Sequence, residues 1–295
     1  MAVGSRIEDT DYNAIRAKIV NIMGPGAGQF GYGQSIVSSE VDRGFPITKD
    51  QWDALRFDIL NARLHQDGLE PLIIEAVRGQ PIRFSSQQPN TQYSSQSDIA
   101  IANKFNIGSG QFVINSAGTV TRTTSWNSSI SSSITVTFGN ANQARWFFNS
   151  GGRIRLTSSR SGGAATAQNT AWSSLLSSVG TVSFDATNFY QSTTSPATLL
   201  IAQSSFPYYT ANRYRITHSC NVANNINAGA TVVTITAIWE DGYVDTKPGP
   251  PGDSVDGTLS LVVDELRASG ILFPAGTPPF VVSRPSYNIT SISGS

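Results

Sequence analysis

The chain has 295 residues and a mass of 31.5 kDa, which is enough for one large domain or two ordinary ones. Charged residues make up only 14% of the sequence, against about 25% in a typical soluble protein, and the formal net charge is zero. This composition excludes a highly charged disordered protein and a basic nucleic-acid-binding protein. We also expect no membrane insertion, because no apolar run approaches the ~20 residues that span a bilayer and no basic-then-apolar leader opens the sequence.

The charges are distributed unevenly along the chain. Residues 1–78 contain 11 acidic and 8 basic side chains, residues 79–240 contain 3 and 9, and residues 241–295 contain 6 and 3. The middle of the chain is therefore basic and both flanking segments are acidic. Such a partition indicates that the three segments have different structural roles.

Residues 1–78 are predicted to form a small helical docking region. Apolar residues recur three and four positions apart and predict one helix over 10–23 and a second over 49–66. Thr48 and Gln51 have the spacing of a capping box at the start of the second helix. We expect this helical pair to dock onto a partner, with contacts made by three apolar side chains of the second helix: Trp52, Phe57 and Leu64.

Residues 79–97 are predicted to be an extended linker or a strand-swapping arm. The segment contains two prolines and many Ser and Gln residues, a composition that favours extended chain over a packed element. It is therefore the best candidate for a boundary between the helical region and the rest of the chain.

Residues 98–245 are predicted to form a β-rich domain, because the apolar pattern changes to a period of two. One helix interrupts this pattern where apolar residues return to helical spacing between Trp172 and Val179. Residues 246–295 are predicted to hold a Pro/Gly spacer, one strand and an extended C-terminal tail. The predicted fold class is α+β, with an antiparallel sheet that carries one packed helix. The strands are expected at 134–138, 181–184, 199–203, 213–218, 231–239 and 258–264.

A β-hairpin is predicted over 145–156, where two segments flank the turn sequence Asn-Ser-Gly-Gly. Basic residues beside aromatic ones can bind single-stranded nucleic acid or anionic glycans. However, the run Trp-Phe-Phe cannot place all three rings on one face of a strand. We therefore favour an interface in which acidic side chains of residues 1–78 of a neighbouring copy pair with the hairpin arginines, Arg145, Arg153, Arg155 and Arg160.

The sequence offers little for catalysis, and we expect no enzymatic activity, no cofactor and no metal ion. Residues 79–240 contain three well-separated acidic residues, whereas glycoside hydrolysis needs two facing carboxylates. No G-x-S-x-G elbow is present, and the Gly-rich segment 24–33 lacks the Lys-Ser/Thr of a phosphate loop. We expect His65 to meet the C-terminal end of its helix as a partly charged side chain, and Cys220 to be a core thiol beside a surface His218.

Several motifs resemble those of a known group of proteins. The stretches DYNAIRAKIVNIMGPGAGQFGYGQS (11–35), ITKDQWDALRFDILNARLHQDG (47–68) and NANQARWFFNSGGRIRL (140–156) resemble segments of virion structural proteins from cyanophages and related tailed phages. The ending PSYNITSISGS is also similar. The resemblance implies a non-enzymatic virion component associated with the tail, its fibres or its neck, and it carries over no catalytic residues.

Two hypotheses of function follow. The first is a structural assembly protein of the virion that binds other virion proteins and its own copies, as a trimer or a larger homo-oligomer, without binding nucleic acid. The second is a receptor-binding adhesin that recognises a host surface glycan. The aromatic side chains that suit glycan contact are Trp126, Tyr208 and Tyr209.

Overall fold

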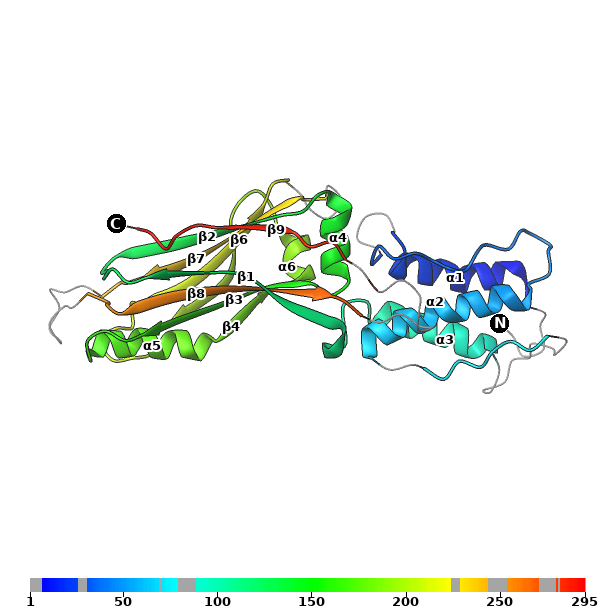
Figure 1. Ribbon diagram of the computed structural model, residues 1–295, viewed down its shortest axis with the longest axis horizontal. Coiled ribbons are helices and arrows are strands. Elements are labelled where there is room, and N and C mark those ends of the chain that lie inside the picture. The colour runs from blue at the N-terminus through cyan, green and yellow to red at the C-terminus, as the bar shows by residue number, and fades with distance from the viewer. Residues whose placement is uncertain are drawn as a thin grey trace. The chain divides into compact units, whose positions relative to one another are not determined.

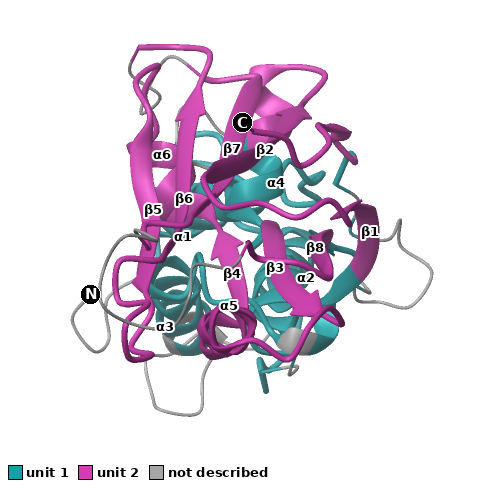
Figure 2. Cartoon of the chain, turned by 90° about the vertical axis from the view of Figure 1, so that its left-hand side faces the viewer, with its two compact units in different colours: residues 1–113, 145–152, 267–283 teal, residues 114–144, 153–266, 284–295 magenta. Residues whose placement is uncertain are grey.

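The computed structural model describes residues 7–25, 31–68, 71–78, 89–223, 229–243, 254–270, 280 and 282–294. Within them the chain forms six α-helices and two antiparallel sheets, which confirms the predicted α+β class. The α-carbon contacts divide the chain into two compact units, coloured separately in Figure 2. Unit 1 comprises residues 1–113, 145–152 and 267–283; unit 2 comprises 114–144, 153–266 and 284–295. The units therefore differ from the consecutive segments predicted, because unit 1 also takes two short later stretches.

Unit 1 contains the helices α1 (Asp9–Met23) and α2 (Lys49–Asp67), as predicted. Each begins at a capping box, formed by Glu8 with Asp11 and by Thr48 with Gln51. Gly68 adopts a left-handed conformation (φ 69°) and ends α2. Both helices were predictable because their start, stop and apolar spacing are local signals.

A third helix, α3 (Pro89–Ala102), corrects the prediction of an extended linker over 79–97. Proline is favourable in the first turn of a helix, where its missing N–H costs nothing. Tyr93, Ser97 and Ala100 then follow at helical spacing, and all three side chains are fully buried. The remainder of the predicted linker, residues 79–88, lies outside the described residues.

Unit 2 is built from two sheets, which Figure 1 shows one above the other with α5 along the lower one. One sheet has the order β1-β8-β3-β4 and the other β5-β6-β7-β2-β9.

The predicted strands and the predicted helix over 172–179 are confirmed within these elements. The predicted Pro/Gly spacer lies mostly outside the described residues. The bounds are β1 (Phe112–Arg122), β2 (Ser129–Thr137), β3 (Arg153–Ser161), β4 (Thr181–Phe184), β5 (Ala197–Gln203), β6 (Arg213–Cys220), β7 (Val232–Glu240), β8 (Thr258–Ala268), β9 (Ser286–Ile289), α5 (Ala167–Val179), α6 (Ala186–Gln191) and the short 3₁₀-helix Ser109–Gln111.

The core of unit 2 lies between the two sheets. Strands β2, β6, β7 and β8 bury every second side chain over most of their lengths, as expected when one face of a strand packs inward. Trp239 on β7 is fully buried, and its indole Nε1 donates a hydrogen bond to Ser158 Oγ on β3 at 3.0 Å. This bond ties the two sheets together and satisfies the polar atom of a core tryptophan.

The predicted hairpin over 145–156 is wrong, because its first half is the helix α4 (Ala141–Asn149). The Asn140 side chain accepts a hydrogen bond from the Gln143 N–H at 2.9 Å, as a helix N-cap does. At the other end Gly151 has φ 87°, and the Gly152 N–H donates to Phe147 O at 2.8 Å. The glycines that favoured a hairpin turn therefore end a helix instead.

Candidate interaction site

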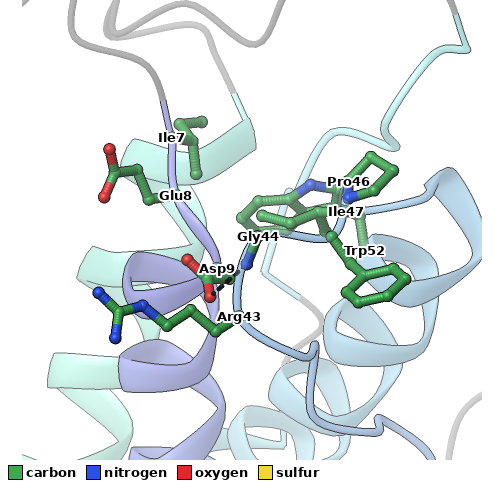
Figure 3. Close-up of a pocket in the computed structure, with 9 residues that line it drawn as sticks. Ile7, Glu8, Asp9, Arg43, Gly44, Pro46, Ile47 and Trp52 are labelled. Atoms are coloured by element: carbon green, nitrogen blue, oxygen red, sulfur yellow. Dashed lines mark hydrogen bonds between the residues drawn. The ribbon is translucent and has the colours of Figure 1, made fainter.

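A pocket of about 520 Å³ lies in unit 1 where α1 and α2 begin (Figure 3). Its volume falls in the range of typical ligand sites. Carboxylates come from the start of α1, an indole comes from α2, and the remaining wall comes from the segment that precedes α2. The lining residues are Ile7, Glu8, Asp9, Arg43, Gly44, Phe45, Pro46, Ile47 and Trp52.

One of the two carboxylates of the pocket also holds its wall in place. Glu8 caps α1 together with Asp11, and Asp9 accepts a hydrogen bond from the Gly44 N–H at 3.2 Å. Gly44 has φ 83°, a conformation that most other residues adopt only with strain. The segment before α2 is thus held against the start of α1, and the shape of the pocket is set in advance.

Trp52 forms the inner wall of this pocket and does not lie on the surface. Its ring packs edge-on against Tyr12 at 5.2 Å and Tyr93 at 5.0 Å between ring centroids, and the side chain is fully buried. Trp52 was expected to contact a partner directly, and the structure places it in the core of the three helices instead. Phe45, at the same pocket, is 66% exposed.

The other two docking residues predicted on α2 are neither core residues nor fully exposed. Phe57 and Leu64 are both partly buried. Exposed apolar side chains lie instead shortly after α2, in the segment 71–78. Leu72 is 87% exposed, and Ile74 and Val77 are exposed as well. We call these three side chains the apolar strip.

The backbone that carries the apolar strip is held in place by polar contacts from two helices. The Arg56 guanidinium on α2 donates to Ile73 O at 2.7 Å and lies 3.6 Å from the Glu75 carboxylate. On α3, the Gln92 side chain accepts a hydrogen bond from the Ile74 N–H at 3.1 Å. Ile73 and Ala76 are buried beneath. Sequence reasoning missed the strip because an irregular segment has no periodic spacing of apolar residues. The only signal was a short apolar run between a proline and charged residues.

The arginines of the predicted hairpin lie in different elements. Arg145 belongs to α4, and Arg153 and Arg155 belong to β3; all three are partly buried. Arg155 pairs with Asp264 of β8 at 3.3 Å, and Arg160 pairs with Asp256 at 3.2 Å. Acidic residues of the same chain therefore neutralise these two arginines, which corrects the interpretation that a neighbouring copy supplies their partners.

Of the three aromatic residues considered for glycan contact, the structure exposes one. Trp126 is buried and packs edge-on against Trp172, with ring centroids 4.7 Å apart. Tyr209 is fully buried against Tyr243. Tyr208 is 62% exposed and has φ 70°, the one positive φ among the described residues other than glycine. Such a conformation costs energy for a bulky residue and indicates a tightly determined turn.

Ser192 and Cys220 of unit 2 are not activated as nucleophiles. His218, expected at the surface, is buried, and its Nδ1 lies 2.8 Å from Ser192 Oγ. Because the Ser192 hydroxyl donates to Asn188 O, it accepts from His218 and keeps its own proton. The Cys220 thiol donates to Val222 O, and burial raises its pKa. Within the described residues no three His, Cys, Asp or Glu side chains converge on a possible metal site, and no helix is long and apolar enough to cross a membrane.

Comparisons with known proteins give no relative. No protein-family model, no curated protein and no solved structure matches this chain. The support for a function therefore comes from the sequence resemblance and from the surfaces described above.

Proposed function

We propose that this chain is a non-enzymatic structural component of a tailed-phage virion, located in the tail, fibre or neck, which binds other virion proteins and its own copies. The resemblance of three separate segments to cyanophage virion proteins supports this function. The structural observation that carries it is the apolar strip of unit 1. An assembly protein needs apolar surface that stays exposed in the free chain and becomes buried against its neighbour.

The apolar strip suits such a contact because its backbone is already ordered. Burying a Leu or Val side chain completely contributes roughly 1.5–3 kcal/mol. Association also costs free energy when a loop must be ordered, and a segment held by Arg56 and Gln92 avoids much of that cost. Leu72 and Val77 therefore have the exposure and the fixed geometry that a docking contact needs.

Replacing Leu72 and Val77 together with Ser is expected to reduce incorporation of the chain into virions at least tenfold while the protein remains folded. Both side chains are exposed, so the double change removes little core packing. Incorporation is measured by quantitative mass spectrometry of purified particles, after complementation of a phage that lacks the wild-type copy. Val37→Ser is the matched control, since Val37 is 59% exposed elsewhere in unit 1.

The same experiment tests the whole proposal. Wild-type chain must be found in purified particles, and its absence from them would overturn the assignment to the virion. Incorporation of the double variant at the wild-type level would leave the virion assignment standing and reject the apolar strip as the contact.

A second candidate function, glycan recognition by a host-binding adhesin, is supported by the exposed Tyr208. Its neighbour Tyr209 anchors the turn in the core and leaves the phenol ring of Tyr208 in solvent. If this candidate is correct, the wild-type chain binds one sugar class on a glycan array and Tyr208→Ala abolishes the signal. Binding that survives Tyr208→Ala, or no binding by the wild type, rejects it.

A further inference from the structure

The two sheets of unit 2 have four edge strands, and three of them are protected. Strands β4 and β9 are only four residues long. On β1, Ser116 O accepts a hydrogen bond from the Arg284 guanidinium at 2.9 Å, and the Ile289 side chain lies against Gly118. Short length and charged side chains are the means by which natural proteins prevent sheets from joining edge to edge.

The fourth edge, β5, is longer than β4 and β9 and has no charged side chain, although a register irregularity leaves only Leu200–Gln203 regular. Its sequence ATLLIAQ is seven residues long and contains no charged side chain. One side pairs with β6 from Ala197 opposite His218 to Gln203 opposite Arg213, and Figure 2 shows β5 on the outside of that sheet. No strand pairs with its other side among the residues that the structure describes. Ile201, near the middle of β5, is 58% exposed although α5 lies close to this strand.

We propose that β5 pairs edge to edge with β5 of a second copy, in antiparallel orientation about a two-fold axis near Ile201. The inference rests on the proposed self-association and names its contact, which gives a dimer in place of the trimer or larger homo-oligomer expected from the sequence. An antiparallel strand edge is self-complementary, because each copy presents the same alternating N–H donors and C=O acceptors. Residues directly opposite each other lie on one face, so the two exposed Ile201 side chains pack together.

The absence of charge on β5 favours a second copy as the occupant of this edge. Since β5 carries no charge, the two-fold arrangement places no like charges opposite each other. The dimer is also a closed assembly, because each β5 edge pairs with the other and leaves no free β5 edge for a third copy. A closed pair explains how a chain can keep an uncharged edge without growing into an open aggregate.

The length of the regular edge sets the strength of this contact. A register irregularity between Thr198 and Leu200 interrupts the ladder with β6, so the regular part of β5 runs from Leu200 to Gln203. Such a short seam gives a small interface of the kind found in weak complexes. The mass in solution is therefore expected to rise with protein concentration, toward twice the 31.5 kDa of one chain.

Light scattering after size exclusion, run on the full chain over a hundredfold range of concentration, tests the seam. Ile201→Lys is expected to remain a monomer at concentrations where the wild type is a dimer. Ile114→Lys is the matched control, because Ile114 is 59% exposed on the edge strand β1, and it is expected to dimerise like the wild type. Gln203→Lys, also exposed on β5, provides a second variant of the seam.

A mixing experiment tests whether the two Ile201 side chains face each other. Ile201→Lys and Ile201→Glu are each expected to be monomeric alone and to form a heterodimer when mixed, because opposite charges across the seam attract. If the seam variants associate as strongly as the wild type, the β5 contact is rejected and self-association stands. If the wild type is monomeric at every concentration, self-association itself is rejected, while virion incorporation still tests the proposed function.

Discussion

Trp52→Ala is expected to lower the free energy of unfolding by about 3–5 kcal/mol, the range for removing a large aromatic side chain from a core. The indole is fully buried between Tyr12 and Tyr93, one from each neighbouring helix. Its removal joins a cavity to the existing pocket and takes away both edge-on aromatic contacts. Urea denaturation followed by circular dichroism at the helix wavelength measures the change.

Phe45→Ala is the matched control for Trp52. Both rings line the same pocket, but Phe45 is mostly exposed, so its loss is expected to change the unfolding free energy by no more than about 0.5 kcal/mol. An equal effect of the two substitutions would contradict the placement of Trp52 in the helical core. It would restore the hypothesis that Trp52 is a surface contact.

Lowering the pH from 7 to 4 is expected to remove about 3 kcal/mol of stability through His65 alone. The imidazole stacks on Phe280 with centroids 3.9 Å apart, and Tyr32 packs against it edge-on at 5.1 Å. Its Nε2 donates to Ser150 O at 3.0 Å, while the buried Nδ1 has no hydrogen-bond partner among the described residues. Burial therefore lowers the pKa of His65 to about 4, and the side chain is neutral where it was expected to be partly charged.

The direction of the pH effect follows from the lowered pKa. The unfolded chain binds a proton at His65 below pH ~6.5, but the folded chain binds it only near pH 4. Between these values the unfolded state holds more protons, so stability falls as the pH falls. Urea denaturation at intervals from pH 7 to pH 4 measures the slope.

His65→Gln separates this effect from general acid denaturation. The Gln side chain does not titrate and can still donate a hydrogen bond to Ser150 O. The variant is expected to lose most of the slope between pH 6.5 and 4. His218→Gln is the control for the second buried histidine, whose pKa is also lowered by burial. An unchanged slope in His65→Gln would show that other groups cause the acid sensitivity.

Local signals predicted the first two helices because they need no distant partner. Thr48 and Gln51 form the expected capping box within one turn, and Gly68 ends α2 within the same stretch of chain. The strand pattern was equally readable on β6 and β7, where alternate residues face the core. Periodicity and caps belong to the sequence itself, and the structure confirms them.

The segment 140–152 shows where local signals were ambiguous. Its glycines fit a hairpin turn and a helix end equally well. The choice depends on contacts from elsewhere in unit 1: the Asn149 side chain donates to Gly31 O at 3.0 Å, and the Trp146 indole donates to Pro25 O at 2.9 Å. These partners lie more than 100 residues away in sequence, so no local pattern could show them.

The sequence by itself determined the α+β class, the approximate positions of most strands and the low content of charged residues. Only the tertiary structure decided which apolar side chains remain exposed. Trp52 and Leu72 are both apolar and lie close together in sequence, yet one is fully buried and the other is 87% exposed. Likewise Arg155 carries a charge that any acid could neutralise, and the β3–β8 register selects Asp264. Periodicity determines which face of an element is apolar, whereas exposure and charge pairing depend on what the rest of the chain places against that face.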